Sequence, residues 1–281
     1  MANMDFKLGY QLYSAREEAE KDLRATLHSV KEMGYDGVEF AGFYGHGAGE
    51  VAQLLRQTGL QAVSSHVPLD TLETDLEKTT DDHRRIGCRY IAIPHLPPER
   101  APGGEAFAAT IRSIARIGAY LKREGIGLLY HNHDFEFTEV SRQYGLDFLY
   151  DAVADDMLAS ELDTCWIRVA GEDPAAYIRK YAGRCPVVHL KDYVGTKGEQ
   201  AVYALIDRSG KDDQAVAASD TFDFRPVGYG VQDIPAILRA GTESGTRWFV
   251  VEQDRSSDRP ALAAARMSAG YVLALRTGNK A

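Results

Sequence analysis

Residues 86–93 read Ile86-Gly87-Cys88-Arg89-Tyr90-Ile91-Ala92-Ile93, in which one glycine separates a helix-like segment from a short β-rich run. Such a unit is expected where a helix ends, because glycine readily adopts the left-handed conformation that turns the chain toward the next strand. The unit recurs along the chain and predicts strands that alternate with helices. The other copies contain Met33-Gly34, Thr58-Gly59, Glu124-Gly125 and Ser244-Gly245.

Alternation of strands and helices favours a parallel sheet, and eight units favour a closed (β/α)8 barrel over an open doubly wound sheet. A dinucleotide-binding fold would need Gly-x-Gly-x-x-Gly after an early strand, and the glycines from Gly42 to Gly49 lack that spacing. The expected strands are Leu8 to Leu12, Gly37 to Phe40, Leu60 to His66, Tyr90 to Ile93, Gly127 to Asn132, Leu158 to Asp163, Pro186 to Leu190 and Trp248 to Gln253. The expected helices are Lys21 to Met33, Glu50 to Thr58, Leu72 to Ile86, Glu105 to Glu124, Tyr144 to Val153, Pro174 to Tyr181, Val231 to Ser244 and Pro260 to Leu275.

One domain is expected over residues 1–281, because no linker rich in Pro, Gly or Ser divides the chain. A long polar loop insertion at about 194–230 follows the seventh expected strand. Its composition suits a lid over the barrel mouth, and it equally suits a surface insertion or a contact in a homo-oligomer. The two interpretations stay open.

Net charge and cysteine usage exclude several classes of function. A net charge of −9 and a pI of about 5.4 disfavour nucleic acid and anionic membranes as partners. The sequence has no targeting segment and no apolar run of membrane-spanning length, so we expect a cytoplasmic protein. Cys88, Cys165 and Cys185 are too far apart for a thiolate zinc site, and Cys165 is interpreted as an inert apolar residue.

Four polar residues each follow an apolar run: Glu136, Asp163, His189 and Glu252. Barrel active sites lie at the carboxyl ends of the strands, so these side chains are expected to meet at one rim. Three carboxylates and one imidazole suit a single divalent metal ion, with Mn²⁺ favoured and Mg²⁺, Co²⁺ or Zn²⁺ as alternatives.

Six segments near the expected strand ends form an ordered pattern over most of the chain. They are Gly9-Tyr10-Gln11-Leu12-Tyr13-Ser14, Tyr130-His131-Asn132-His133-Asp134-Phe135-Glu136-Phe137, Glu161-Leu162-Asp163-Thr164-Cys165-Trp166, Val188-His189-Leu190-Lys191-Asp192, Pro226-Val227-Gly228-Tyr229-Gly230 and Val251-Glu252-Gln253-Asp254. This pattern resembles the sugar phosphate isomerase/epimerase superfamily, whose fold is the xylose isomerase-like TIM barrel.

The resemblance implies that Glu136, Asp163, His189 and Glu252 bind the metal and that Glu136 and Glu252 exchange a proton with the substrate. The implied activity is isomerisation or epimerisation of a sugar or keto-sugar through a metal-stabilised enediolate. Some relatives place the first ligand nearer the strand, in which case His131 or His133 would replace Glu136. The residues expected to bind the carbohydrate are Gln11, His66, His95, His131, His133, Trp166, Lys191 and Asp192.

The sequence leaves three alternatives to the isomerase hypothesis. Ketose 3-epimerases carry an arginine soon after the seventh-strand histidine, whereas this chain has none between His189 and Arg208. That difference makes a lyase or dehydratase on 3-keto-glycosides the main alternative. An apurinic-site endonuclease, which would need more histidine ligands and a basic face, and a non-catalytic sugar-binding protein are further alternatives.

Overall fold

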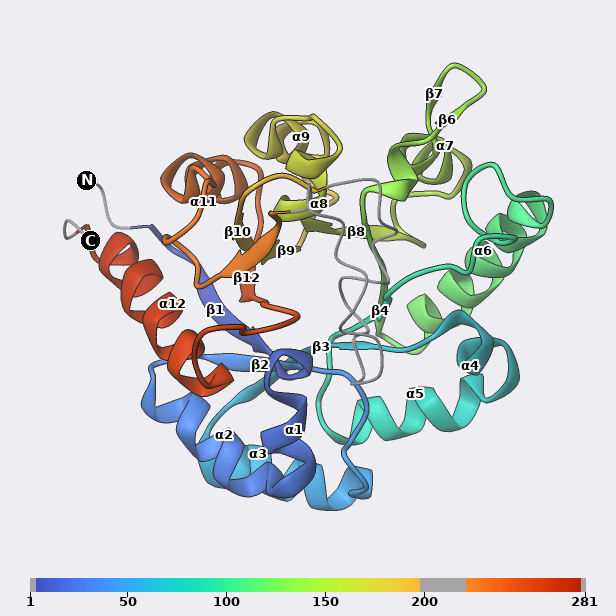
Figure 1. The fold of residues 1–281 in the computed structure, drawn as a ribbon. Helices are drawn as coiled ribbons and strands as arrows, with labels where there is room; N and C mark the ends of the chain where they lie inside the picture. Colours follow the sequence, from blue (N-terminus) through green and yellow to red (C-terminus); the bar gives the residue numbers. More distant parts are fainter. Residues whose placement is uncertain (1–3, 198–220, 279–281) are drawn as a thin grey trace, which may run out of the picture.

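Eight parallel strands form a closed barrel in the computed structural model, which describes residues 4–197 and 221–278 (Figure 1). Neighbouring strands pair in the order β1-β2-β3-β4-β5-β8-β9-β12, and β12 pairs with β1 to close the ring. This confirms the predicted fold. The strands are β1 (Lys7–Gln11), β2 (Gly37–Phe40), β3 (Gln61–His66), β4 (Tyr90–Ile93), β5 (Gly127–His131), β8 (Ala159–Asp163), β9 (Val187–Leu190) and β12 (Trp248–Val251).

Helices surround the barrel (Figure 1), and the predicted helix Leu72 to Ile86 is divided in two. Between α1 and α2 the chain is extended at Asp22, whose side chain accepts a hydrogen bond from the N–H of Ala25 and caps α2. The short helices α1 and α8 were not predicted, because six residues are too few for a clear helical pattern. The helices are α1 (Arg16–Lys21), α2 (Leu23–Glu32), α3 (Ala48–Thr58), α4 (Leu69–Thr74), α5 (Leu76–Arg85), α6 (Phe107–Arg123), α7 (Gly145–Ala152), α8 (Thr164–Val169), α9 (Pro174–Lys180), α11 (Ile234–Glu243) and α12 (Ala261–Arg276), with the 3-10 turns η1 (Leu12–Ala15) and η2 (Phe135–Phe137).

Glycine ends the helices in the way that the repeated unit predicts. Gly59 follows α3 with φ of 68°, and its N–H donates to the carbonyl of Leu55 at 2.9 Å. All five glycines of the repeated unit have positive φ. This left-handed conformation turns the chain back toward the barrel after each helix.

Side-chain alternation along the strands divides the barrel interior into an apolar base and a polar upper part. The base is a buried cluster that includes Leu129, Val187, Trp248 and Val250. Two residues further along β5 and β9, at His131 and at His189, the inward side chains become polar while remaining buried. The carboxyl ends of the strands therefore carry the candidate site.

Only the ends of the predicted loop insertion at about 194–230 fall within the described residues. There, β10 (Asp192–Val194) pairs antiparallel with β11 (Asp223–Arg225), so part of the predicted loop is a two-stranded ribbon. A second small ribbon joins β6 (Glu139–Val140) to β7 (Gln143–Tyr144). Residues 198–220 lie outside the described residues, and the choice between lid and oligomer contact stays a prediction. Within 4–197 and 221–278, the helices are all too short or too polar to cross a membrane.

Candidate active site

Four side chains from four neighbouring strands converge on one point at the carboxyl end of the barrel. His131 ends β5, Asp163 ends β8, His189 lies on β9 and Glu252 follows β12. One nitrogen or oxygen atom of each lies within 4.8 Å of those of the others, and at most 4% of any of these residues is exposed. We call these four residues the ligand cluster. Two imidazoles and two carboxylates at this spacing are a donor set for a divalent metal ion.

Two buried carboxylates lie behind the imidazoles of the ligand cluster. Nε2 of His131 faces Asp163 Oδ2 at 3.8 Å, while its Nδ1 lies 3.2 Å from Glu161 Oε1, close enough for an ion pair although not aligned as a hydrogen bond. Nδ1 of His189 lies 2.8 Å from Glu252 Oε2, and its Nε2 lies 3.1 Å from Glu39 Oε1. Each imidazole thus presents one nitrogen to the cluster and the other to a carboxylate, an arrangement that fixes ring orientation in metal sites.

Lys191 pairs with the two carboxylates of the ligand cluster and with Asp254. Its Nζ lies 2.8 Å from Glu252 Oε2, 2.9 Å from Asp163 Oδ2 and 3.0 Å from Asp254 Oδ2. Burial alone would lower the pKa of Lys191, but Asp163, Asp254 and Glu252 outweigh it and hold the pKa well above its usual value. Lys191 is therefore a buried ammonium at neutral pH.

The buried charges around the ligand cluster do not balance. Five carboxylates, of Glu39, Glu161, Asp163, Glu252 and Asp254, face three cationic groups, Lys191, His66 and His189, so the positive charge is two short. Without further positive charge, some carboxyl groups must hold protons. Burial raises the pKa of Glu161 to about 7 and that of Asp254 to about 6. His189 must lose its ring proton to bind a metal, so a dication would reduce the excess of negative charge from two to one, and this donor set fits a divalent metal.

His66 bridges the two carboxylates beneath the ligand cluster. Its Nε2 lies 2.7 Å from both Glu39 Oε1 and Glu161 Oε1. Burial would lower the pKa of His66, but the charges of Glu39 and Glu161 raise it to about 10. Burial lowers the pKa of His131 and of His133, so both of these imidazoles are neutral.

Glu136, which the sequence analysis assigned as a ligand and as half of the acid–base pair, lies outside the ligand cluster. Its carboxylate accepts hydrogen bonds from the hydroxyl of Tyr130 at 2.7 Å and from the N–H of His133 at 2.8 Å. Tyr130 points away from the barrel interior because its neighbour His131 points inward. Glu136 therefore turns back against the outside of β5, and burial raises its pKa to about 8. Among the described residues, Glu136 is not part of a group of side chains that could hold one ion.

Three of the predicted carbohydrate-binding residues do not line the cavity above the ligand cluster. Gln11 donates to Glu39 inside the barrel. Trp166 is fully buried against Phe222 and Phe224, and the Nζ of Lys191 lies 5.3 Å from its ring centroid.

Asp192 is the third of these residues, and backbone N–H groups already donate hydrogen bonds to both of its carboxylate oxygens. Its two oxygens accept hydrogen bonds from the N–H groups of Tyr193, Gly228, Gly230 and Gln232 at 2.9 to 3.1 Å. The side chain holds the turn after β11 beside β10 instead of facing a ligand. The predicted contact of Asp192 with a carbohydrate therefore finds no support in this geometry.

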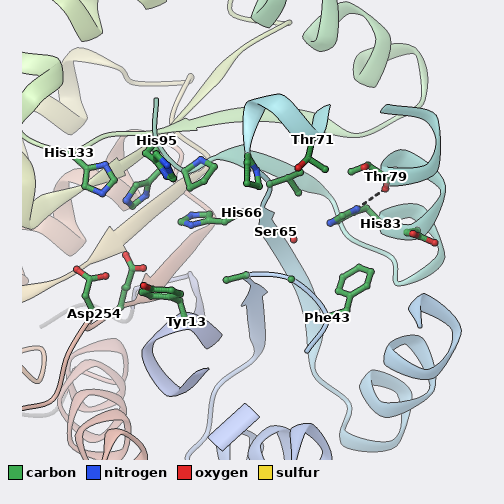
Figure 2. Close-up of a pocket in the computed structure, with 18 of the residues that line it drawn as sticks. Tyr13, Phe43, Ser65, His66, Thr71, Thr79, His83, His95, His133 and Asp254 are labelled. Carbon is green, nitrogen blue, oxygen red and sulfur yellow. Dashed lines mark hydrogen bonds between the residues drawn. The ribbon is translucent and has the colours of Figure 1, made fainter. Parts of the chain in front are cut away.

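The other predicted binding residues do line a cavity of about 780 Å³ that opens above the ligand cluster. Figure 2 shows His66, His95 and His133 along one part of it, with Asp254 and Tyr13 below them. The remaining wall at this end comes from His131, Lys191 and Glu252. The cavity therefore gives a small molecule direct access to residues of the ligand cluster and to Lys191.

Glu39, Glu161 and Asp254 belong to the candidate site but were not singled out from the sequence. The strand periodicity offers a signal for Glu161, which lies two residues before Asp163 on β8 and so shares its inward face. Asp254 lies two residues after Glu252, beyond the end of β12.

Comparison with known proteins gives a family match over most of the chain. The model of the family described as "Xylose isomerase-like TIM barrel" matches residues 27–272. An inosose dehydratase from Geobacillus kaustophilus is 21% identical over 273 residues, which cover 88% of this chain and 85% of that protein. "Inosose dehydratase 2" from Bacillus cereus is 29% identical over 153 residues, about half of each chain.

A solved structure of a sugar phosphate isomerase/epimerase from Parabacteroides distasonis has the same fold. It superposes with a TM-score of 0.75 at 21% identity, covering 98% of this chain and 95% of that one. At this identity the likeness concerns the fold alone, and the chemistry has to be argued from the site itself.

Proposed function

Because the chain belongs to the xylose isomerase-like TIM barrel family, we propose that it is a divalent-metal-dependent lyase that eliminates water or another leaving group from a cyclic keto-sugar or keto-polyol. Its relatives named inosose dehydratase support a substrate of this kind. The supporting site is the ligand cluster with Lys191 beside it.

The proposed ligands are His131, Asp163, His189 and Glu252. Replacing Glu136 by His131 gives two imidazole donors in place of one, which favours Mn²⁺, Co²⁺ or Zn²⁺ over Mg²⁺ because Mg²⁺ prefers oxygen ligands. A divalent ion bound there would polarise the substrate carbonyl and so make the neighbouring C–H bond more acidic.

The observation that carries the proposal is the pairing of an acid and a base on one wall of the cavity. Glu252 Oε2 and Lys191 Nζ are 2.8 Å apart, and both residues line the cavity. Burial would raise the pKa of Glu252, but Lys191 and His189 lower it, so the group is a carboxylate at neutral pH. A carboxylate accepts a proton and an ammonium donates one, which gives general acid–base catalysis from a single face.

In the proposed reaction, Glu252 removes the proton from the carbon beside the substrate carbonyl, and the electron pair moves onto the carbonyl oxygen. When the carbonyl re-forms, a carbon–carbon double bond forms and the bond to the leaving oxygen on the next carbon breaks. Lys191 protonates that oxygen as it departs. For a hydroxyl group, the net change is loss of one water molecule with no oxidant or reductant.

Epimerisation shares the first proton transfer but needs a second proton donor on the opposite face of the sugar. The sequence-based hypothesis gave that role to Glu136, whose carboxylate is engaged by Tyr130 and His133. Elimination needs only the pair on one wall, and we therefore place it ahead of epimerisation.

The test is incubation of the Mn²⁺-loaded protein with an inosose in D2O. We expect loss of water by mass spectrometry and an absorbance from the new enone. Deuterium incorporation into recovered ketone with no loss of water would overturn the lyase proposal in favour of an epimerase.

Variants of the acid and the base separate the two steps. At saturating Mn²⁺, Lys191→Met should keep exchange of the C–H proton and lose elimination by about 100-fold or more. Glu252→Gln should lose both. Equal exchange in Glu252→Gln and wild-type protein would remove the proposed base.

A further inference from the structure

The cavity above the ligand cluster extends into a second compartment that the proposed elimination does not use. Figure 2 shows Phe43, Thr71, Thr79 and His83 gathered at the end opposite His133 and Asp254, with Ser65 between the two groups. We call this end the distal compartment. A cavity of about 780 Å³ lies in the upper part of the range of about 300–1,000 Å³ that encloses drug-sized ligands, so it exceeds the needs of one sugar ring.

His83 brings an unpartnered hydrogen-bond acceptor to the distal compartment. Its Nδ1 lies 2.6 Å from the carbonyl oxygen of Thr79, and because a carbonyl only accepts, Nδ1 must carry the ring hydrogen. Nε2 then presents a lone pair, and it has no hydrogen-bond partner among the described residues. Only 6% of His83 is exposed, so little solvent reaches it. A buried acceptor of this kind is stabilised by a ligand that donates a hydrogen bond.

Ser65 and Phe43 complete the recognition surface of the distal compartment. Ser65 is 1% exposed, and its hydroxyl also lacks a partner within the described parts of the chain. The half-buried ring of Phe43 lies 5.3 Å from the ring of His83. Together these side chains offer an aromatic face and two polar atoms, which is how proteins bind a flat or puckered ring that carries a hydroxyl.

The charges of the lining exclude a phosphate as the occupant. Among the described lining residues there is no arginine, and Lys191 is the only lysine. Lys191 is paired with Asp163, Glu252 and Asp254 at the other end of the cavity. Asp82 lines the cavity close to His83 in the sequence and would repel an anion.

We propose that the distal compartment binds a second, neutral ring bearing a hydroxyl group, joined to the ring that reacts at the ligand cluster, so that the substrates are glycosides. This inference rests on the proposed function, because it takes the ligand cluster as the reacting end. Ser65 and His66 are adjacent on β3, with Ser65 between the two groups of Figure 2 and His66 beside the other histidines, so a two-ring molecule would span the two ends across this strand.

The experiment measures binding by calorimetry with the Mn²⁺-loaded protein and three non-reacting probes: methyl, phenyl and hydroxyphenyl β-glucosides. The hydroxyphenyl probe is used as both the 3- and the 4-hydroxy isomer. We expect phenyl glucoside to bind about tenfold more tightly than methyl glucoside, and one hydroxyphenyl isomer to bind more tightly again. Equal affinity, or no binding by any probe, would overturn the inference.

Variants test which residues produce the expected gains in affinity from the phenyl ring and from its hydroxyl group. Phe43→Ala should remove the advantage of phenyl over methyl glucoside. His83→Phe should keep that advantage and remove the further gain from the hydroxyl, and Ser65→Ala tests the same gain should His83→Phe fold poorly. His46→Phe, the same change at a histidine outside the lining, is the matched control. An undiminished hydroxyl gain in both His83→Phe and Ser65→Ala would contradict the inference.

Failure of this inference is distinguishable from failure of the proposed function. Binding of the glucosides does not depend on turnover, whereas the test of elimination uses an inosose with a single ring. A protein that dehydrates the inosose but binds all glucosides equally would keep its proposed function and lose the distal site.

Discussion

Asp163 and Glu136 are both fully buried carboxylates near the carboxyl end of the barrel, but their surroundings differ in kind. Asp163 ends β8 and faces His131 and Lys191 with one oxygen, while Glu136 lies in a short turn after β5 and is satisfied by its own segment. A strand directs its side chains by strict alternation, whereas a loop can turn them back. The difference teaches that position at a strand end, and not burial or charge alone, brings a residue into this site.

The largest effect on metal affinity is expected for Asp163→Asn, which tests whether the carboxylate at the end of β8 binds the metal. Oδ1 of Asp163 also caps α8 by accepting from the N–H of Cys165 and Trp166, and an asparagine oxygen keeps that cap. The substitution therefore removes a ligand charge and keeps the cap, while the amide nitrogen replaces Oδ2 opposite the ammonium of Lys191. We expect metal affinity to fall by more than about 100-fold, since even residues behind the ligands contribute 10- to 100-fold.

Metal content after dialysis and the rise in Tm on adding Mn²⁺ measure this effect, because a ligand that binds only the folded protein stabilises it. Wild-type protein should show a clear rise in Tm and Asp163→Asn little or none. An unchanged rise in the variant would show that Asp163 does not bind the ion.

A smaller loss of metal affinity is expected for Glu161→Gln, which changes a buried carboxylate beside the imidazoles of the ligand cluster. Glu161 lies 3.2 Å from Nδ1 of His131 and 2.7 Å from Nε2 of His66, and with these two residues and His189 it forms a second group that could hold an ion. The amide keeps the size but loses the charge that orients the two imidazoles. We expect metal affinity to fall by about 10- to 100-fold.

The visible spectrum of the Co²⁺-substituted protein separates this positioning role from a general loss of stability. A change in ligand orientation shifts the d–d bands, while a merely less stable protein keeps them until it unfolds. Identical spectra and metal affinities for Glu161→Gln and wild type would remove Glu161 from the metal site.

Glu136→Gln should leave metal affinity within about threefold of wild type, because Glu136 lies outside the ligand cluster. In the variant, the amide oxygen can accept from the N–H of His133 while the amide nitrogen donates to the hydroxyl of Tyr130. Equilibrium titration with Mn²⁺ measures the effect. A loss as large as that of Asp163→Asn would restore the sequence-based ligand set and break the comparison.

The barrel could be predicted from the sequence because each of its strands and most of its helices carry local signals. Short apolar runs, glycines such as Gly59 and Gly87 after helices, and regular spacing all agree with the global fold. The short helix α1 and the break between α4 and α5 were missed, because neither α1 nor α4, at six residues each, is long enough for a clear helical pattern.

The site was predictable where it rests on strand ends and unpredictable where it rests on loops. Asp163, His189 and Glu252 meet as the strand register requires, with Asp163 opposite His189 in the pairing of β8 and β9. Asp192 and Glu136 are acidic residues in the expected segments, but turns of the backbone satisfy their oxygens. Such turns are set by tertiary packing, which a single sequence does not reveal.

The protonation of Glu136 gives a further test of the comparison, through the pH dependence of stability. Burial raises the pKa of Glu136 to about 8 from an ordinary value of 4.5, so between these values the folded protein holds a proton that the unfolded chain has lost. Stability from this group is therefore fully present below pH 4.5 and is lost as the pH rises toward 8, by at most about 1.4 kcal/mol per pH unit. Glu136→Gln is neutral throughout and should lack this dependence.

Urea unfolding of both proteins at roughly pH 5, 6.5 and 8 measures the effect. Glu161 and Asp254 also have raised pKa values, of about 7 and about 6, so the wild-type curve alone mixes several groups. The difference between wild type and Glu136→Gln isolates Glu136, because the other groups are common to both. The variant should gain stability relative to wild type as the pH rises. Parallel curves would mean that Glu136 is ionised in the folded protein at neutral pH, as a metal ligand would be, and would place it with Asp163 after all.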